Sequence, residues 1–366
     1  MKVQAKELQK AVSLAGRFCN KSSPIEIYKC VLLSTNQDGL VVEATDAETQ
    51  VKCQVEANLE EGDPHGRFAA TPQEVLENIL RHSPKEEITL GWQNGHVALR
   101  HSLGEHRITS IDPSEYPFTE YPDQPLCRIS VSCLQEAVRL VYPCADSSWS
   151  SRAALTAILF SKDGDTLKLV ATDGRILGCA TCKAVELKEE LEGFLVPAYA
   201  LNKLVGHLAP GEVDLCLDEN SGAVLSERLQ MGFRLIQGEF PDWKKVIPDY
   251  HTEPLVPVAR ELFVSALRQI SKNDDEVVSA VMQVKDGTLL LESEGINGRS
   301  QISICVPEDF QFPKARINVA LMLKLLSGIQ DTVVSFVWKT SDAPIVVKAH
   351  QESNPSFLGL IMPMQL

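Results

Sequence analysis

The sequence predicts an α+β protein made of three copies of one unit, each a β-sheet that carries two helices. Two observations predict this fold class. The first is an internal repeat with a period of about 122–128 residues, which is typical of repeated architectures. The second is that helical and strand-like patterns follow one another in the same order in each repeat. We therefore expect three domains, with boundaries near 1–124, 125–252 and 253–366.

Each repeat opens with an amphipathic helical pattern. Apolar residues recur at steps of three and four positions, so one stripe of each helix should face a core. The three stretches are 6–12 (KELQKAV), 133–138 (CLQEAV) and 261–267 (ELFVSAL).

A strand-like run that ends in Asp-Gly follows each of these helices. Asp-Gly between two such runs predicts a hairpin, because a type I′ turn needs positive φ at both central residues. The pairs are Asp38-Gly39, Asp163-Gly164 and Asp286-Gly287. We expect the returning strands at 40–46, 167–173 and 289–294.

A second helix is predicted in each repeat. The stretches are 71–84, 197–210 and 317–330. Thr71 is placed to cap the first of them, and Pro72 and Pro197 stand where a helix accepts proline in its opening turn. Strand pairs close each unit, and two units end alike, in SEYP at 114–117 and GEFP at 238–241.

The composition favours a globular protein of the cytoplasm. Hydrophobic residues make up 44% of the chain and charged residues 23%. No apolar run reaches the roughly 18 residues that a membrane span needs. The start, MKVQAKELQKAV, lacks the apolar core of a signal peptide. The ten cysteines are scattered through a long chain, which favours buried, reduced thiols over a disulfide framework.

The net charge of −14 argues against nucleic-acid binding unless positive charge is concentrated locally. The six helical stretches with their flanking residues, 5–17, 71–84, 132–141, 197–210, 259–272 and 317–330, supply such a concentration, with ten Lys and Arg against five acidic residues. The candidate DNA-binding residues are these ten, with Lys21 from the following loop: Lys6, Lys10, Arg17, Lys21, Arg81, Arg139, Lys203, Arg260, Arg268, Lys272 and Lys324. Contacts to phosphate alone carry no sequence information and permit sliding, so a basic lining inside an acidic ring is one interpretation. Ordinary solvated helix faces are the other, and the threefold repeat favours the ring.

No pattern predicts catalysis, a cofactor or a metal site. Asp46 and Asp173 recur within Ala-Thr-Asp at the same position of two repeats, which favours a turn or strand-end role. Walker A, G-x-G-x-x-G, G-x-S-x-G and H-E-x-x-H motifs are all missing from the sequence. Cys179 and Cys182 form a lone C-x-x-C without the second ligand pair that structural zinc needs. Aromatic residues, at 6%, are too sparse for a platform that stacks single-stranded bases.

Three segments carry a resemblance to a known family: 171–175 (ATDGR), 238–248 (GEFPDWKKVIP) and 360–366 (LIMPMQL). Over essentially its whole length the chain resembles the β subunit of bacterial DNA polymerase III, the β sliding-clamp family. The resemblance implies the DNA-clamp fold, in which two subunits join head to tail in a ring of six domains with twelve helices lining the hole. It also implies a non-enzymatic sliding clamp that encircles duplex DNA and confers processivity on the replicative polymerase.

The resemblance implies two further sets of residues. The catalytic subunit of the polymerase, the clamp loader and other proteins with a clamp-binding motif dock a peptide between the second and third domains. The residues of this client pocket are Leu155, Thr172, Gly174, Arg175, Leu177, Pro241, Lys245, Val246, Met362, Pro363 and Met364. The contact between the subunits of the homodimer maps to His106, Ile108, Gln269 and Ile270. His106 stands where an aromatic residue is usual, which implies a weaker, pH-sensitive contact.

Several residues depart from the family pattern. After Gly174 the family usually has His-Arg-Leu, whereas this chain has Arg175-Ile176-Leu177. Either the Arg is displaced, or one residue is deleted and Arg175 takes its role. Trp243 replaces the usual Tyr, Gln365 replaces the usual basic residue, and the first domain diverges around 22–24 (SSP).

Two alternatives remain open at the level of sequence. The departures in the client pocket fit a clamp paralogue that serves repair or a mobile element. An enzyme that uses the region of Asp46 and Asp173, or the C-x-x-C, is the alternative from a different class.

Overall fold

The computed structural model describes residues 1–117, 119–147, 152–250, 253–272, 278–349 and 354–365. The chain forms two compact units. Unit 1 comprises residues 1–125 and 207–234, and unit 2 comprises residues 126–206 and 235–366. The three domains expected from the sequence have other boundaries and stay a prediction, and residue 252, the expected end of the second, lies outside the described residues.

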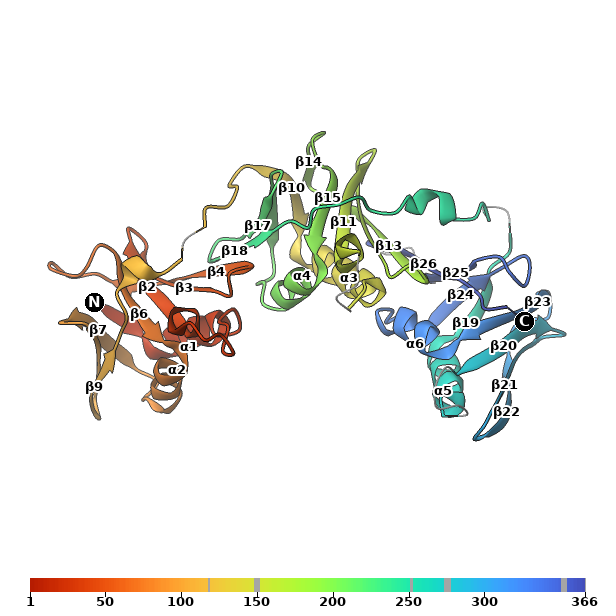
Figure 1. Cartoon of the computed structure of the whole chain (residues 1–366), viewed down its shortest axis with the longest axis horizontal. Helices are drawn as coiled ribbons and strands as arrows, with labels where there is room; N and C mark the ends of the chain where they lie inside the picture. The colour runs from red at the N-terminus through yellow and green to blue at the C-terminus, as the bar shows by residue number, and fades with distance from the viewer. Residues whose placement is uncertain (118, 148–151, 251–252, 273–277, 350–353, 366) are drawn as a thin grey trace. The chain divides into compact units, whose positions relative to one another are not determined.

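The order of elements repeats three times along the chain (Figure 1). In each repeat a strand leads into a helix, further strands follow, and a second helix precedes three last strands. The predicted helices are confirmed: the first helix of each repeat is longer than the predicted stretch, and the second helix is shorter. Their bounds are α1 Ala5–Ala15, α2 Gln73–His82, α3 Val131–Val141, α4 Ala198–Val205, α5 Arg260–Ile270 and α6 Val319–Ser327.

Unit 1 holds two runs of neighbouring antiparallel strands and the helices α1 and α2. One run is, in spatial order, β5 (Ala57–Asn58), β1 (Lys2–Gln4), β7 (Glu87–Gln93), β8 (His96–His101) and β9 (Gly104–Thr109). The other is β16 (Glu212–Leu217), β17 (Ser221–Leu225), β18 (Leu229–Arg234), β4 (Thr49–Val55), β3 (Gly39–Thr45), β2 (Cys30–Asn36) and β6 (Gly66–Pro72). The short 3-10 helices are η1 (Glu26–Lys29) and η2 (Pro113–Glu115).

Unit 2 holds the four remaining helices and three groups of strands. The largest sheet is β15 (Glu192–Pro197), β11 (Ala157–Asp163), β12 (Thr166–Thr172), β13 (Ile176–Lys183), β26 (Ser356–Ile361), β25 (Ile345–Ala349), β24 (Val333–Val337) and β19 (Val256–Ala259). A second sheet is β22 (Gly298–Cys305), β21 (Thr288–Gly295), β20 (Ser279–Lys285) and β23 (Phe312–Asn318), and β14 (Glu186–Leu187) pairs with β10 (Pro125–Ser130). The 3-10 helices are η3 (Tyr142–Cys144), η4 (Ala153–Thr156) and η5 (Trp243–Val246).

Strands from different repeats pair within both units. In unit 1, β18 of the second repeat pairs with β4 of the first. In unit 2, β26 of the third repeat pairs with β13 of the second. The same two positions of the repeat are joined each time: the third strand after the first helix, and the last strand of the next repeat. The sheets are thus continuous from one repeat to the next, which the sequence analysis did not predict.

The three predicted Asp-Gly hairpins are all confirmed as strand pairs, but their turns differ. Asp286 and Gly287 both have positive φ, +50° and +70°, as a type I′ turn requires. In the other two hairpins the paired residues are Asn36 with Gly39 and Asp163 with Thr166, so the turn is shifted by one residue in opposite directions. The type I′ prediction is therefore wrong for these two.

The predicted cap of α2 is also wrong. Thr71 is buried in β6, and its hydroxyl lies 3.0 Å from the hydroxyl of Ser110. The residues that precede α2 and α4 are Pro72 and Pro197, which stand at the N-cap and supply no side-chain hydrogen bond. The fixed φ of proline sets the entry of the chain into these two helices instead.

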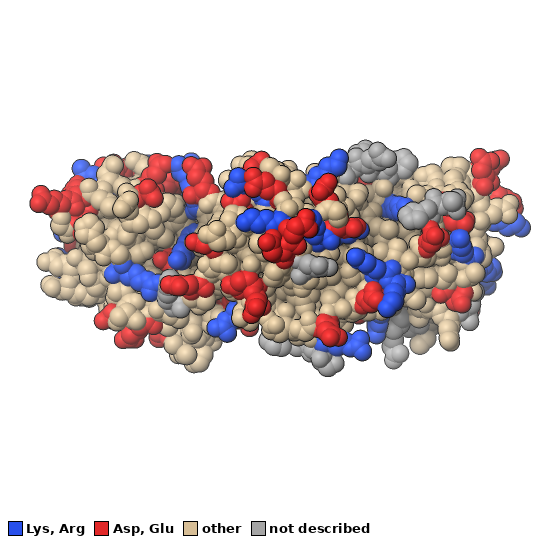
Figure 2. All heavy atoms as spheres, turned by 90° about the horizontal axis from the view of Figure 1, so that it is seen from above, with Lys and Arg blue, Asp and Glu red and all other residues tan. Residues whose placement is uncertain are grey.

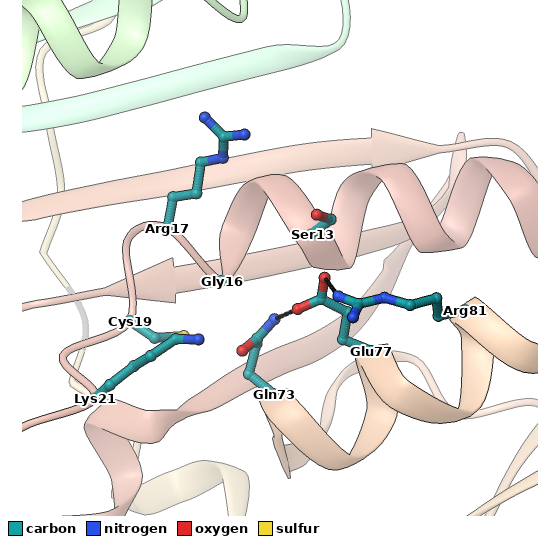
Figure 3. A pocket seen from close by; sticks show the side chains of 8 residues that line it. All are labelled: Ser13, Gly16, Arg17, Cys19, Lys21, Gln73, Glu77 and Arg81. Atoms are coloured by element: carbon teal, nitrogen blue, oxygen red, sulfur yellow. Dashed lines mark hydrogen bonds and ion pairs between the residues drawn. The ribbon is translucent and has the colours of Figure 1, made fainter.

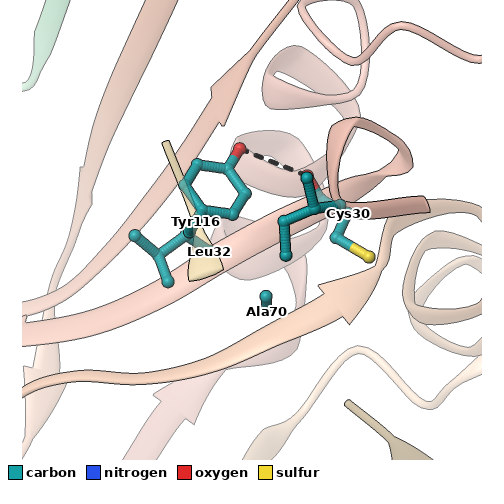
Figure 4. Close-up of a cluster of buried hydrophobic side chains, with 5 residues drawn as sticks. Cys30, Leu32, Ala70 and Tyr116 are labelled. Atoms are coloured by element: carbon teal, nitrogen blue, oxygen red, sulfur yellow. Dashed lines mark hydrogen bonds between the residues drawn. The ribbon is translucent and has the colours of Figure 1, made fainter. Parts of the chain in front are cut away.

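Apolar packing anchors the segment after β9 to unit 1. Tyr116 packs with Cys30, Leu32 and Ala70 in a buried cluster that Ile27 completes (Figure 4). Its hydroxyl donates to the backbone carbonyl of Cys30 at 3.3 Å. A buried hydroxyl needs such a partner, so this bond fixes the segment on β2 and β6.

A close backbone approach joins α6 to α3 in unit 2. Gly328 ends α6 in a right-handed conformation, and a Cβ at this position would lie 2.5 Å from the carbonyl oxygen of Arg139. Gly206 ends α4 in the same conformation with open space around it. The two glycines thus have the same conformation at the end of a helix, and they differ in how closely other atoms surround them.

We expect Gly328→Ala to lower the free energy of unfolding by about 1–3 kcal/mol, because backbone atoms cannot move aside cheaply. Gly206→Ala should be neutral or slightly stabilising. Urea denaturation followed by circular dichroism measures both. Equal denaturation midpoints for the two variants would contradict the packing described here.

Candidate functional sites

The basic side chains predicted to bind DNA fall into two groups. Seven are exposed: Lys6, Lys10, Arg17, Lys21 and Arg81 in unit 1, and Arg268 and Lys272 at the end of α5 in unit 2. In α1 the exposed lysines lie opposite a buried stripe that includes Leu8 and Val12, as the amphipathic pattern predicts. These seven side chains can reach a ligand in solvent.

The remaining four, all in unit 2, are half-buried, and three of them have side-chain contacts within the protein. Arg139 donates to the carbonyl of Gly328 and pairs with Glu136. The ammonium of Lys324 donates to the carbonyl of Ala145 at 3.2 Å and pairs with Asp173 at 3.1 Å. The ammonium of Lys203 lies 5.4 Å from the ring centroid of Tyr199. Arg260 completes this group. Some of the positive charge that was expected to contact DNA thus interacts with other groups of the protein.

One face of the molecule carries acidic and basic side chains interspersed, with no continuous field of either sign (Figure 2).

Two open grooves adjoin α1 in unit 1. The first, with a volume of about 410 Å³, is lined by Ser13, Gly16, Arg17, Cys19, Lys21, Gln73, Glu77 and Arg81 (Figure 3). Gln73 donates to Glu77 at 2.6 Å, and Arg81 donates to the same carboxylate at 2.8 Å. Burial raises the pKa of the Glu77 carboxyl, but these hydrogen bonds outweigh it and hold the pKa below its usual value. The charge of Arg81 is thus partly neutralised, whereas Arg17 extends away from this network (Figure 3).

The second groove, of about 360 Å³, is more strongly basic. Its lining is Lys6, Gln9, Lys10, Ser13, Leu14, Arg17, Lys85 and His207, without a carboxylate. Lys85 and His207 were missed by the sequence analysis. Lys85 lies one residue beyond the predicted helix 71–84. His207 was not counted among the basic residues, because histidine is mostly neutral at pH 7.

The turn after β12 presents Gly174 and Arg175, two exposed residues of the client pocket. The Asp173 carboxylate accepts from the N–H groups of Arg175 and Ile176, both at 2.9 Å, and Gly174 adopts φ +85°. The corresponding turn of the first repeat has the same bonds from Glu48 and Thr49 to Asp46. Both carboxylates of the repeated Ala-Thr-Asp thus cap turns, as the sequence analysis expected.

The C-terminal segment lies beside this turn. β26 pairs with β13, with Leu177 opposite Leu360, and the N–H of Met362 then donates to the carbonyl of Arg175 at 3.0 Å. The N–H of Met364 donates to the carbonyl of Arg316 at 2.7 Å. Residues from distant parts of the chain, 172–177 and 360–364, are therefore neighbours. Leu366, the last residue of the 360–366 segment, lies outside the described residues.

A third segment, 238–246, packs on the same sheet. Trp243 is buried with the ammonium of Lys168, from β12, 5.6 Å from its ring centroid, and Gly238 lies against Ala154 of η4. Lys245 pairs with Asp242 at 2.6 Å on the surface. Segments from η4, the β12–β13 turn, η5 and the C-terminus thus lie on or beside one part of the sheet in unit 2.

Exposure divides the residues predicted for the client pocket into a buried set, called the floor below, and an exposed set, called the rim. Leu155, Thr172 and Leu177 are buried within the unit and form the floor. Pro363 and Met364 are half-buried. The exposed rim consists of Gly174, Arg175, Pro241, Lys245, Val246 and Met362. Val246 and Met362 are large apolar side chains that remain 47% and 45% exposed, which is the type of surface that an apolar peptide covers.

Of the four residues assigned to the subunit contact, only His106 and Gln269 are exposed. Ile108 and Ile270 are buried in their own units, so their side chains belong to the cores. His106 lies on β9, and its Nε2 is 3.2 Å from Nε2 of His101. Within the described residues, β9 and β22 each end a sheet.

The cysteines have the character of core residues. All ten are free thiols, eight of them buried. Burial raises the pKa of Cys179 to about 11, and a hydrogen bond with Cys133, together with burial, raises that of Cys182. Among the described residues, no group of three or more His, Cys, Asp or Glu side chains is arranged to hold a metal ion. None of the helices in the described part of the chain is long and apolar enough to cross a membrane.

Comparisons with known proteins agree with this architecture. The family model "DNA polymerase III beta subunit, N-terminal domain" matches residues 1–121, and the model for the central domain matches residues 128–242, together more than half of the chain. The beta sliding clamp of Chlamydia pneumoniae is 25% identical over 374 residues, covering 100% of this chain and 98% of the relative.

Solved structures show the same fold over the full length. The DNA polymerase III subunit beta from Pseudomonas aeruginosa superimposes with a TM-score of 0.90 at 21% identity, covering 100% of both chains. The sliding clamp from Bartonella birtlesii, solved bound to griselimycin, has a TM-score of 0.87 at 21% identity and covers 100% of this chain and 99% of its own. With both family models matched in order and the fold shared from end to end, the chain belongs to the family of DNA polymerase III beta subunits.

Proposed function

We propose that the chain is a DNA sliding clamp, a non-enzymatic ring subunit that encircles duplex DNA in the cytoplasm and tethers the replicative polymerase to it. The observation that carries the proposal is the full-length match to proteins named beta sliding clamp, in both sequence and fold. The exposed basic side chains of α1, α2 and α5 supply phosphate contacts that are blind to base sequence. The Asp46 and Asp173 carboxylates are engaged in turns, which removes the main support for an enzyme.

The function is tested by primer extension with a DNA polymerase of the organism, with and without this chain and its clamp loader. We expect longer products per binding event when the chain is present, because a tethered polymerase rebinds before it diffuses away. Unchanged product length would contradict the clamp proposal. Stimulation of a repair polymerase alone would favour the paralogue.

The pairing of strands between repeats supports a head-to-tail dimer. The third strand after the first helix pairs with the last strand of the following repeat, as β4 with β18 and β13 with β26. By the same rule β22 of the third repeat would pair with the strand equivalent to β9. Because β9 is the last strand of the first repeat, the rule is satisfied by β9 of a second copy. Such a contact between unlike ends must close into a ring or polymerise.

Positive charge at the end of α5 should contribute to DNA binding. The double variant Arg268→Glu, Lys272→Glu should weaken binding of a short duplex and flatten its dependence on salt. The slope of log K against log salt should fall by about 0.9 for each phosphate that the variant no longer neutralises. Fluorescence anisotropy at several salt concentrations measures this. The control, Lys285→Glu with Lys314→Glu, makes the same charge change on exposed strand residues of unit 2. An equal effect of both variants would show that net charge alone matters.

The client pocket is the proposed docking site of the polymerase and the clamp loader. We expect deletion of residues 362–366 to abolish binding of a Gln-Leu-x-Leu-Phe-type peptide, since it removes Met362 from the rim together with the half-buried Pro363 and Met364. Met362→Ala should cost about 1–2 kcal/mol of binding free energy, as for a peripheral anchor. Arg175→Ala tests whether Arg175 has taken the role of the family's Arg. Anisotropy of a labelled peptide measures these changes.

Val185→Ala is the matched control for the pocket, because Val185 is another exposed apolar residue of unit 2, 54% accessible. It should bind the peptide as the unaltered chain does. If the truncated chain also binds normally, the pocket has been placed wrongly.

A further inference from the structure

Arg17 lies where the two grooves of unit 1 meet. It lines both of them, as does Ser13, and it follows Gly16, the C-cap of α1. Its guanidinium points away from the Gln73–Glu77–Arg81 network, so the Glu77 carboxylate does not neutralise it (Figure 3). Arg17 is therefore a cation that the two grooves share.

A histidine holds this guanidinium in place. Nη1 of Arg17 lies 2.8 Å from Nε2 of His207. Because a guanidinium has only donors, His207 must accept through an unprotonated Nε2, and its ring is neutral with the proton on Nδ1. Burial, and secondly the charge of Arg17, lower the pKa of His207, which is consistent with a neutral ring at neutral pH.

The charged side chains that line the groove of His207 are all basic. Besides Arg17, the titratable groups of its groove are Lys6 and Lys10 on α1 and Lys85 after α2. Lys10 pairs with Glu7 at 2.8 Å, whereas Lys6 and Lys85 form no ion pair within the described residues. An anion that enters the groove thus meets several cations and one neutral imidazole.

We propose that His207 is a positioning residue that aims the Arg17 guanidinium at a backbone phosphate of duplex DNA and takes up a proton when that phosphate binds. The inference rests on the proposed DNA-binding function. It adds two residues, His207 and Lys85, to the phosphate contacts of unit 1.

The proton uptake follows from hydrogen-bond chemistry. Protonated His207 cannot accept from Arg17, and two adjacent cations repel, so protonation is unfavourable in the free protein. A phosphate oxygen between them can accept from both Nε2–H and the guanidinium, which removes the repulsion. The bound state therefore holds a proton that the free state lacks. Affinity for duplex DNA must then rise as the pH falls toward and below the ordinary histidine range, near about 6.5.

Three variants of the full-length chain separate the two roles of His207. His207→Gln keeps an acceptor that can hold Arg17 but does not titrate. His207→Ala removes both the acceptor and the titration. His82→Gln is the control, because His82 is an exposed histidine of the same unit at the end of α2, outside both grooves. Binding of a fluorescent duplex is measured by anisotropy at low salt between about pH 7.5 and pH 6.

At about pH 7.5 we expect His207→Ala to weaken binding roughly threefold, as for a partly exposed polar contact, and His207→Gln to bind as the unaltered chain does. On lowering the pH, the unaltered chain and His82→Gln should gain roughly threefold more affinity than His207→Gln. A pH dependence of His207→Gln equal to that of the unaltered chain overturns the proton uptake. Normal binding by His207→Ala overturns the positioning role.

The same measurements distinguish a failure of the proposed DNA-binding function from a failure of the inference about His207. If the unaltered chain binds no duplex at low salt, both proposals fall together. If it binds, and Arg268→Glu with Lys272→Glu weakens that binding while the His207 variants change nothing, only the inference about His207 is wrong.

Discussion

The backbone hydrogen bonds at the sheet edges are the constraint on which the rest of this structure depends. A strand at an edge exposes unpaired N–H and C=O groups, which must find a partner or be protected. The second and third repeats meet this need by pairing their last strand with a strand of the repeat before, as β18 pairs with β4 and β26 with β13. The pairing of β26 also carries the C-terminus to the β12–β13 turn, where Met362 meets Arg175. Strand pairing thus brings Met362 next to Arg175, two residues of the proposed client pocket.

The arrangement of charge reconciles a net charge of −14 with a DNA-binding role. Binding to phosphate depends on the number of cations that contact the duplex and release its counterions, so a local surface can bind within an acidic protein. In unit 2, Arg139 and Lys324 are engaged with carbonyls and carboxylates that hold α3 and α6 in place. In unit 1, Lys6, Arg17 and Lys85 face an open groove without a carboxylate. Free positive charge is therefore distributed less evenly than the threefold repeat suggested.

Much of the fold could be predicted from the sequence, because periodicity and Asp-Gly turns are local signals that recur three times. The six helices and three hairpins are confirmed. The pairing of β13 with β26 could not be predicted, since residues some 180 positions apart share no local signal. Thr71 was wrongly taken as a cap because it belongs to β6, where it pairs with Val31, 40 positions earlier in the sequence. Ile108 and Ile270 were assigned to the subunit contact, but their side chains are buried within their own units. His207 was missed because its role depends on Arg17, 190 positions away.

The central claim is that the chain forms a closed ring around DNA, and topology tests it most directly. The chain is loaded on a nicked circular plasmid by its clamp loader, washed in high salt to remove contacts that rest on charge alone, and followed by gel filtration before and after the plasmid is cut once. A ring predicts that the protein stays on the circle and leaves when the DNA becomes linear, because it slides off the ends. Equal retention on circular and linear DNA, or loss from both, would contradict the account.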